Sequence, residues 1–180
     1  MNNQNIKTAL SVKKKTAAVL IALAAAFVLP QICHIVGAVS GLGTSVGEAL
    51  LPMQLPILLV GFYAGAIPGA VAGALAPLVS ALITGMPHAD LLPFMMIELC
   101  TYGITCGLLR KVKMPTVVKV LSTQLAGRAI RAAAILVSFY LIGLNSVSPD
   151  VILSSITAGI FGIILQLIIV PLAVRASEKE

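Results

Sequence analysis

The stretch of the chain from Leu50 to Pro87 contains no charged residue. A helix rises about 1.5 Å per residue and a hydrocarbon core is roughly 30 Å thick, so this stretch could cross a membrane about twice. Glycine recurs at every fourth position within it: Gly61, Gly65, Gly69 and Gly73. Small residues at this spacing let helix backbones approach closely where lipid offers no hydrophobic drive for association. The stretch therefore predicts two short helices, with a turn near Pro68, at the packed centre of a membrane protein.

The composition extends this prediction to the whole chain. Of its 180 residues, 59% are hydrophobic and 10% are charged, and the mean hydropathy is +1.07. Soluble domains average about 25% charged residues. We expect an all-α integral membrane protein with six transmembrane helices in one compact domain (residues 16–174). A cytoplasmic N-terminal segment (1–15) and a cytoplasmic tail (175–180) would flank it.

The apolar runs divide the membrane domain into six expected spans. Their ranges are 16–37, 50–66, 68–84, 91–109, 116–142 and 151–174, and residues 37–49 are expected to form a Gly/Ser/Thr-rich loop. Lys13, Lys14 and Lys15 before the first apolar run would also suit a secretory signal peptide. Because the apolar run is long and further spans follow, we expect a retained helix.

The basic residues predict on which side each loop lies. Of the 12 Lys and Arg residues, all except Arg128 and Arg131 lie near the N-terminus, after the fourth span or near the C-terminus. The loops after the first, third and fifth spans carry Glu48, His88, Asp90 and Asp150 instead. Since cytoplasmic loops carry an excess of Lys and Arg, both termini are expected to be cytoplasmic.

Arg128 and Arg131 fall inside the fifth expected span. With Gln124 they are spaced i, i+4, i+7 and share one helical face. A charge in a span costs roughly 2.5–3.5 kcal/mol on insertion scales and usually faces the bundle interior or a cavity. Glu98, in the fourth span, could pair with either arginine for purely structural reasons. Alternatively, a polar pocket in the outer half of the bundle presents an arginine to an anionic ligand group.

Other polar and small residues allow two interpretations each. His34 and His88 suit the membrane interface better than a metal site, because neither has a ligand at metal-binding spacing; His88 could still touch a ligand at a pocket mouth. Cys33, Cys100 and Cys106 lie in or beside apolar runs and suit buried structural positions. Ala18, Ala22 and Ala26 form a stripe at every fourth position, which could pack inside the bundle or face another membrane subunit.

The runs LLPMQLPILLVGFYAGAIPGAVAGALAPLVSALITGMP and LLPFMMIELCTYGITCGLLRK are similar to those of the substrate-binding S components of energy-coupling factor (ECF) vitamin transporters. The resemblance covers about residues 16–174 and is most specific over 51–102. It implies a small six-helix subunit of a bacterial cytoplasmic membrane that captures a vitamin or related micronutrient from outside. Its partners would be a transmembrane coupling subunit and two ATPases, which hydrolyse ATP to drive uptake.

The resemblance also implies roles for particular residues. The stripe Ala18, Ala22 and Ala26 matches the family's AxxxA motif, which contacts the coupling subunit. The family's pocket, carried onto this chain, gives a candidate substrate-binding set: Glu48, Thr84, Met86, His88, Glu98, Tyr102, Arg128, Arg131 and Asn145. No catalytic residue, metal or cofactor is expected, and the chain lacks a G-x-x-x-x-G-K-[ST] nucleotide motif.

The sequence limits the ligand and the competing functions. Without tryptophan and with few other aromatic residues, stacking on a flat vitamin such as riboflavin or thiamine is less expected; pantothenate, niacin, a cobalamin-like compound or another anionic precursor remains open. A stand-alone transporter or a structural membrane protein is the main alternative function. An intramembrane enzyme would need paired carboxylates or a Ser–His or His–His pair on facing helices, which the spans do not supply.

Overall fold

The computed structural model describes residues 11–144 and 146–177, and this part of the chain is helical with turns. The helices are α1 (Val12–Ser40), α2 (Ser45–Leu50), α3 (Gln54–Ala64), α4 (Ala66–Thr84), α5 (Leu92–Leu109), α6 (Thr116–Val137), α7 (Asp150–Ala158) and α8 (Ile160–Ser177), with a π-helical turn η1 (Ser138–Ile142) continuing α6. Five segments are long and apolar enough to cross a membrane, or six if the bent pair α7–α8 is one span. The prediction of an all-α fold is confirmed for the described residues, and the expected number of six spans is reached if α7 and α8 form one bent span.

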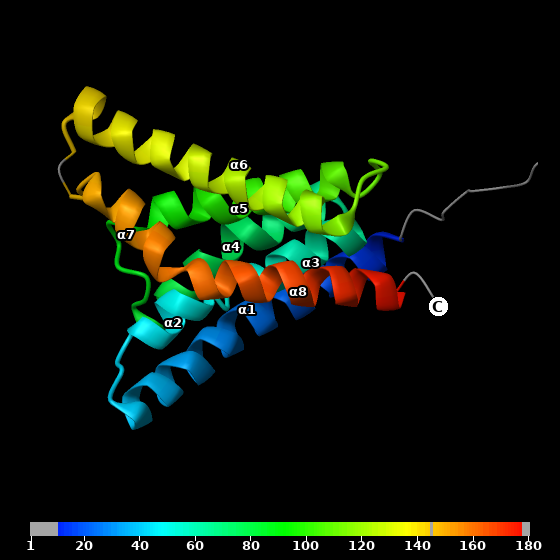
Figure 1. Cartoon of the computed structure of the whole chain (residues 1–180), viewed down its shortest axis with the longest axis horizontal. Helices are drawn as coiled ribbons and strands as arrows, with labels where there is room; N and C mark the ends of the chain where they lie inside the picture. Colours follow the sequence, from blue (N-terminus) through cyan, green and yellow to red (C-terminus); the bar gives the residue numbers. More distant parts are fainter. Residues whose placement is uncertain (1–10, 145, 178–180) are drawn as a thin grey trace, which may run out of the picture.

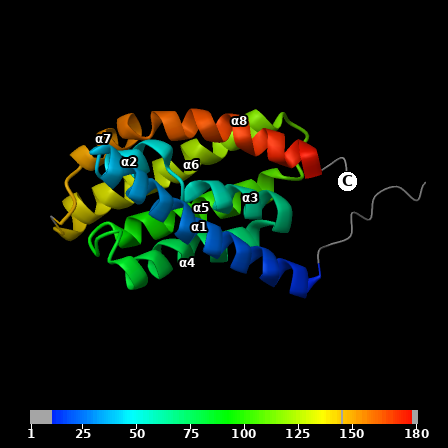
Figure 2. The ribbon, with the colours of Figure 1, turned by 90° about the horizontal axis from the view of Figure 1, so that it is seen from below.

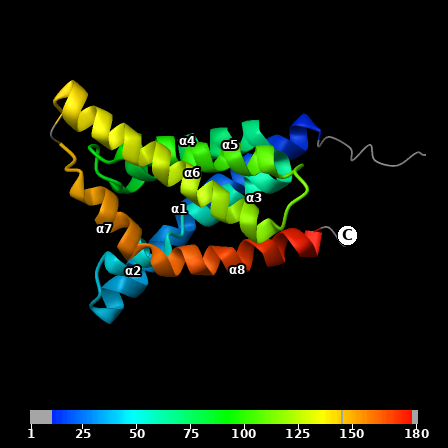
Figure 3. The ribbon, with the colours of Figure 1, turned by 45° about the horizontal axis from the view of Figure 1, so that its top comes forward.

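The long helices run along a common direction, and the loops gather at two ends of the bundle (Figure 1). The first residues of α1, the α5–α6 loop and the end of α8 lie at one end. The α1–α2, α4–α5 and α6–α7 connections lie at the other, where α1 and α6 splay apart (Figures 1 and 3). The basic residues that follow α5, including Arg110 and Lys111, are therefore at the same end as Lys13 and Arg175. We call this the basic end and the other the open end.

Glycine contacts between helix backbones hold the centre together. A Cβ added to Gly69 of α4 would lie 2.6 Å from the carbonyl oxygen of Gly103 in α5. A Cβ on Gly61 of α3 would lie 2.9 Å from that same oxygen. The prediction that the glycine-rich stretch forms the packed centre is confirmed, because its helices touch α5 backbone to backbone. Figure 2 shows α1 crossing this centre on one side and α8 running along another.

Two expectations about helix boundaries in the first half of the chain are wrong. The turn between the second and third spans is at Gly65, whose φ of 102° glycine adopts readily, and Pro68 instead lies in the first turn of α4. Much of the expected loop 37–49 is helical, because α1 continues to Ser40 and α2 begins at Ser45. The loop itself is only residues 41–44, where Gly41 and Gly43 have positive φ.

The sixth expected span is two helices, not one. α7 and α8 meet at Gly159 with a bend of 52°. A Cβ on Gly159 would lie 2.8 Å from Leu51 Cδ1 and 3.1 Å from Arg128 Nη2. A larger residue here would push against these two side-chain ends and against the Ser155 carbonyl oxygen, 3.1 Å away, so glycine suits the bend. The bend swings α7 away from the line of α8, at the open end (Figure 1).

Candidate functional site

A cavity of about 400 Å³ opens between the helices at the open end of the bundle. Its walls come from the second half of α1, from α2, the turn before α3, the α4–α5 loop, α5, α6 and α7. Segments far apart in the sequence therefore share one space. The size is within the range of roughly 300–1,000 Å³ typical of small-molecule sites.

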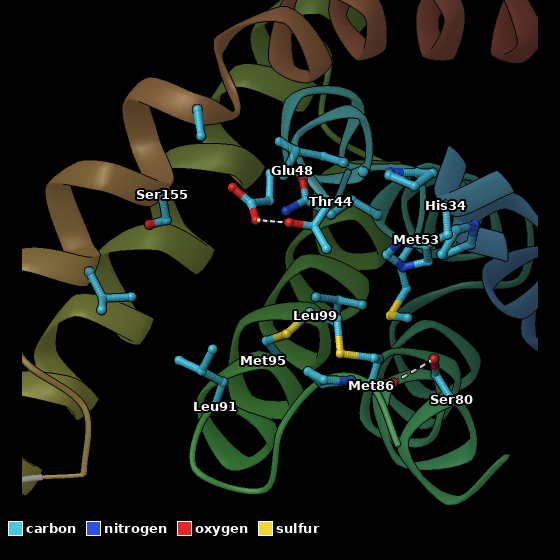
Figure 4. Close-up of a pocket in the computed structure, with 18 of the residues that line it drawn as sticks. His34, Thr44, Glu48, Met53, Ser80, Met86, Leu91, Met95, Leu99 and Ser155 are labelled. Atoms are coloured by element: carbon cyan, nitrogen blue, oxygen red, sulfur yellow. Dashed lines mark hydrogen bonds between the residues drawn. The ribbon is translucent and has the colours of Figure 1, made fainter. Parts of the chain in front are cut away.

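Methionine and leucine side chains form much of the wall. Met53, Met86 and Met95 point toward the same space from three different segments, with Leu91 and Leu99 beside them (Figure 4). Thioethers are flexible and polarisable, so they adapt to irregular ligand shapes and contact aromatic edges well. This wall suits the apolar body of a small molecule.

The α4–α5 loop is held against the cavity by side-chain hydrogen bonds. Ser80 Oγ donates to the carbonyl oxygen of Met86 (2.8 Å, Figure 4), and Thr84 Oγ1 accepts from the backbone N–H of Met86 (3.2 Å). Thr84 Oγ1 also donates to the Ser80 carbonyl at 2.9 Å. These bonds fix the loop so that Met86 and Pro87 face the cavity.

The break between α2 and α3 is held by a cluster of glutamine side chains. Leu51 adopts a left-handed conformation with φ 49°, and its carbonyl oxygen accepts from Gln166 Nε2 of α8 at 3.2 Å. Gln124 of α6 donates in turn to Gln166 Oε1, and Gln54 of α3 accepts from Gln166 at 3.5 Å. All three glutamines are almost fully buried. This cluster connects α3, α6 and α8, and it reaches the cavity through Leu51 and Gln54, which line it.

Glu98 and Arg131 form a buried ion pair at the cavity. Glu98 is 1% exposed; its Oε1 accepts from the Tyr102 hydroxyl (2.6 Å) and its Oε2 from Arg131 Nη1 (3.0 Å). Arg131 keeps 14% exposure and lines the cavity. The sequence left open whether Glu98 pairs with one of the arginines, and in the structure it pairs with Arg131. The same arginine also faces the space where a ligand would bind.

Arg128 lies beside this pair but outside the main cavity. Its Nη1 donates to the carbonyl oxygen of Ser155 at 3.5 Å, near the C-terminal end of α7, where a positive charge stabilises the helix dipole. Its Nε and Nη2 are buried without a hydrogen-bond partner among the described residues, as is Arg131 Nε. A second, very small space of about 10 Å³ separates Glu98, Arg128, Arg131 and Ser155, which is the size of a single water molecule.

The structure brings together most of the nine residues assigned to substrate binding. Glu48, Met86 and Arg131 line the main cavity. Glu98, Tyr102 and Arg128 do not line it but lie close to Arg131. Two others lie outside both spaces: Thr84 supports the loop and His88 is exposed in it. Asn145 lies outside the described residues.

Several cavity residues were not assigned to the site from the sequence, and they fall in three groups. His34 and Thr44 come from α1 and the loop that follows it; Met53, Met95 and Leu99 are apolar; Ser80, Ser154 and Ser155 are small and polar. A spacing pattern would not distinguish them from other residues of apolar spans. Among the described residues, no group of three His, Cys, Asp or Glu side chains could hold a metal ion.

The alanine stripe of α1 faces the interior of the bundle. Ala22 is 5% exposed and Ala26 is fully buried in the main hydrophobic core, and Ala18 packs against that core. α1 lies against α3 and α4 along this face. The internal-packing alternative therefore accounts for Ala22 and Ala26, and a partner subunit would have to contact other side chains of α1, such as the exposed Leu20, Ile21 and Val28.

Comparison of the chain with protein-family models, curated proteins and solved structures gave no match.

Proposed function

We propose that the chain is a multi-pass membrane protein that captures a small solute in the cavity at its open end. The observation that carries this proposal is the cavity itself: it has a volume of about 400 Å³, methionine and leucine form much of its wall, and the partly exposed Arg131 lines it. Pockets of this kind, largely apolar with a few placed polar groups, are typical small-molecule sites.

We further propose that the solute is a vitamin or related micronutrient and that the chain is the substrate-binding subunit of an ECF-type transporter. Support comes from the sequence resemblance and from the position of the cavity. The start of α1, the α5–α6 loop and the end of α8, which carry most of the described basic residues, lie at the end of the bundle opposite the α1–α2 and α4–α5 connections that line the cavity (Figure 1). The positive-inside rule would therefore place the cavity outside and both termini in the cytoplasm. In a bacterial plasma membrane, this orientation suits capture from outside.

The transport step would depend on other proteins. A coupling subunit and two ATPases would bind the chain within the membrane and power release of the solute inside. Because the alanine stripe faces the interior of the bundle, we propose that the coupling subunit contacts the exposed apolar side of α1. Affinity purification of the tagged chain from membranes of its own host should recover these partners.

Uptake measurements test the function and the site together. Radiolabelled vitamins should accumulate in cells that produce the chain with the coupling subunit and ATPases, and inactivating the ATPases should stop uptake. Uptake that continues without the ATPases would favour a stand-alone transporter. No uptake and no bound solute would favour a structural role.

A matched pair of variants locates the site. Ser154→Phe places a ring in the cavity from α7, whereas Thr157→Phe adds the same ring to an exposed position of the same helix that does not line the cavity. Solute binding should be lost in the first variant and kept in the second. Equal solute binding by both variants would show that the cavity is not the binding site.

A further inference from the structure

The buried ionised side chains beside the cavity are unequal in number. Two guanidinium groups, Arg128 and Arg131, are packed against one buried carboxylate, Glu98. Both oxygens of Glu98 are already hydrogen-bonded, one to Tyr102 and one to Arg131. Glu48 also lines the cavity, but it is exposed and accepts from Thr44 (3.1 Å), and no ion pair joins it to an arginine among the described residues. The interior thus holds one positive charge more than it neutralises.

An unbalanced buried cation is costly, and it favours an anionic partner. Arginine binds carboxylates through a planar fork of donors, and such charge-assisted bonds are about twice as strong as neutral ones. Of the two arginines, Arg131 is the one that lines the main cavity. Its Nε has no hydrogen-bond partner among the described residues. A carboxylate that enters the cavity would therefore meet a guanidinium group that still has a donor to offer.

The rest of the cavity limits the body of the ligand. At about 400 Å³, the space is near the small end of the usual range, and a cobalamin-like compound is far larger. The polarisable wall of Met53, Met86 and Met95 favours an aromatic or sulfur-containing ring, or a compact aliphatic chain. The Ser80 hydroxyl also lines the cavity, but its hydrogen bond goes to the Met86 carbonyl oxygen, so its proton is not available to a ligand.

We propose that the ligand is a small monocarboxylate with an apolar, polarisable body, and that Arg131 binds its carboxylate. This inference rests on the proposed solute-capture function and narrows its substrate class. It makes Glu98 a positioning residue: Glu98 holds the Arg131 side chain through Nη1 and competes with the ligand for its charge.

Matched pairs of acids and neutral analogues test the assignment. The probes are nicotinate and nicotinamide, pantothenate and panthenol, biotin and biotinamide, and lipoate and lipoamide, with thiamine as a cation. Binding to the full chain in lipid nanodiscs is read by thermal unfolding, using a thiol-reactive dye that reports exposure of the buried Cys33 and Cys106. At least one acid should bind, and its neutral analogue should bind about ten- to a hundredfold more weakly.

Variants at the ion pair identify the arginine. Arg131→Gln should reduce the affinity for the acid to that for its neutral analogue. Because this change leaves Glu98 without its cation, the double variant Glu98→Gln/Arg131→Gln removes both charges and should show the same loss in a better-folded protein. Glu98→Gln alone releases Arg131 from its partner and should keep or tighten acid binding. Arg175→Gln, at an exposed position near the basic end, is the matched control and should leave binding unchanged.

The outcomes separate this inference from the function on which it rests. If a neutral analogue or thiamine binds as tightly as any acid, and Ser154→Phe abolishes that binding, the carboxylate assignment fails while solute capture stands. Acid binding that survives both Arg131 variants also overturns it. If none of the probes binds, the carboxylate assignment is overturned, and absence of any vitamin uptake in cells would then remove the function as well.

Discussion

Replacing Gly69 by alanine should force the two most closely packed helices apart. The added Cβ would lie 2.6 Å from the carbonyl oxygen and 2.8 Å from the Cα of Gly103. These are backbone atoms of α5, so no side-chain rotation can relieve the overlap. Restoring the ordinary contact distance of 3.4 Å to the carbonyl oxygen requires a separation of about 0.8 Å, and a gap of that size forfeits a quarter to a half of the dispersion energy of nearby atom pairs.

The expected size of the effect follows from this geometry. Overpacking of this kind costs about 1–3 kcal/mol, and for a chain of this length each kcal/mol lowers the unfolding temperature by roughly 2–4 °C. The unfolding temperature should therefore fall by about 2–12 °C. It can be measured in detergent micelles by heating the protein with a dye that labels the buried cysteines as they become exposed. Solute binding should weaken as well, because α5 carries Met95, Leu99 and Glu98 at the cavity.

Gly47→Ala is the matched control for this substitution. Gly47 also lies in a helix, α2, but its added Cβ would meet only His34 Cε1, at an ordinary 3.7 Å. Since alanine is about 1 kcal/mol more favourable than glycine inside a helix, this variant should be as stable as the parent chain or slightly more stable. If Gly69→Ala unfolds at the same temperature as Gly47→Ala or above it, the backbone contact between α4 and α5 is refuted.

Three other substitutions test the buried polar groups. Tyr102→Phe removes the hydroxyl that donates to Glu98 and should cost about 1.5–3 kcal/mol of stability, as for a hydrogen bond to a charged group; Tyr140→Phe, at an exposed position, should cost nothing measurable in the same unfolding assay. Gln124→Leu should destabilise the chain by leaving Gln166 short of one partner. The double variant Gln124→Leu/Gln166→Leu should lose less than the sum of the single losses, and strict additivity in a double-mutant cycle would contradict the contact. Gly127→Leu should be strongly destabilising because its side chain would overlap the buried Tyr102 ring, whereas Ala129→Leu on the exposed side of α6 should leave the unfolding temperature unchanged.

The sequence alone determined that the chain is helical and where its long apolar helices lie, although α2 was expected to be a loop and α7–α8 a single helix. A helix that spans a membrane must be apolar over about 20 residues, because lipid cannot satisfy polar groups, and this requirement is visible in one dimension. The glycine spacing likewise marked the close-packed centre, and the charges of Glu98, Arg128 and Arg131 marked a buried polar region.

Only the tertiary structure decided how these features meet. At the kink, Gly159 lies against the side-chain ends of Leu51, from the turn before α3, and Arg128, from α6, and no local pattern predicts these neighbours. The choice of Arg131 over Arg128 as the partner of Glu98 is likewise set by how α5 and α6 face each other. The methionine wall of the cavity and the inward direction of the alanine stripe were hidden for the same reason. In a chain that is apolar almost throughout, hydrophobicity shows that a residue lies in one of the long apolar helices, but helix packing decides whether it is exposed, packed against a neighbouring helix or at the cavity.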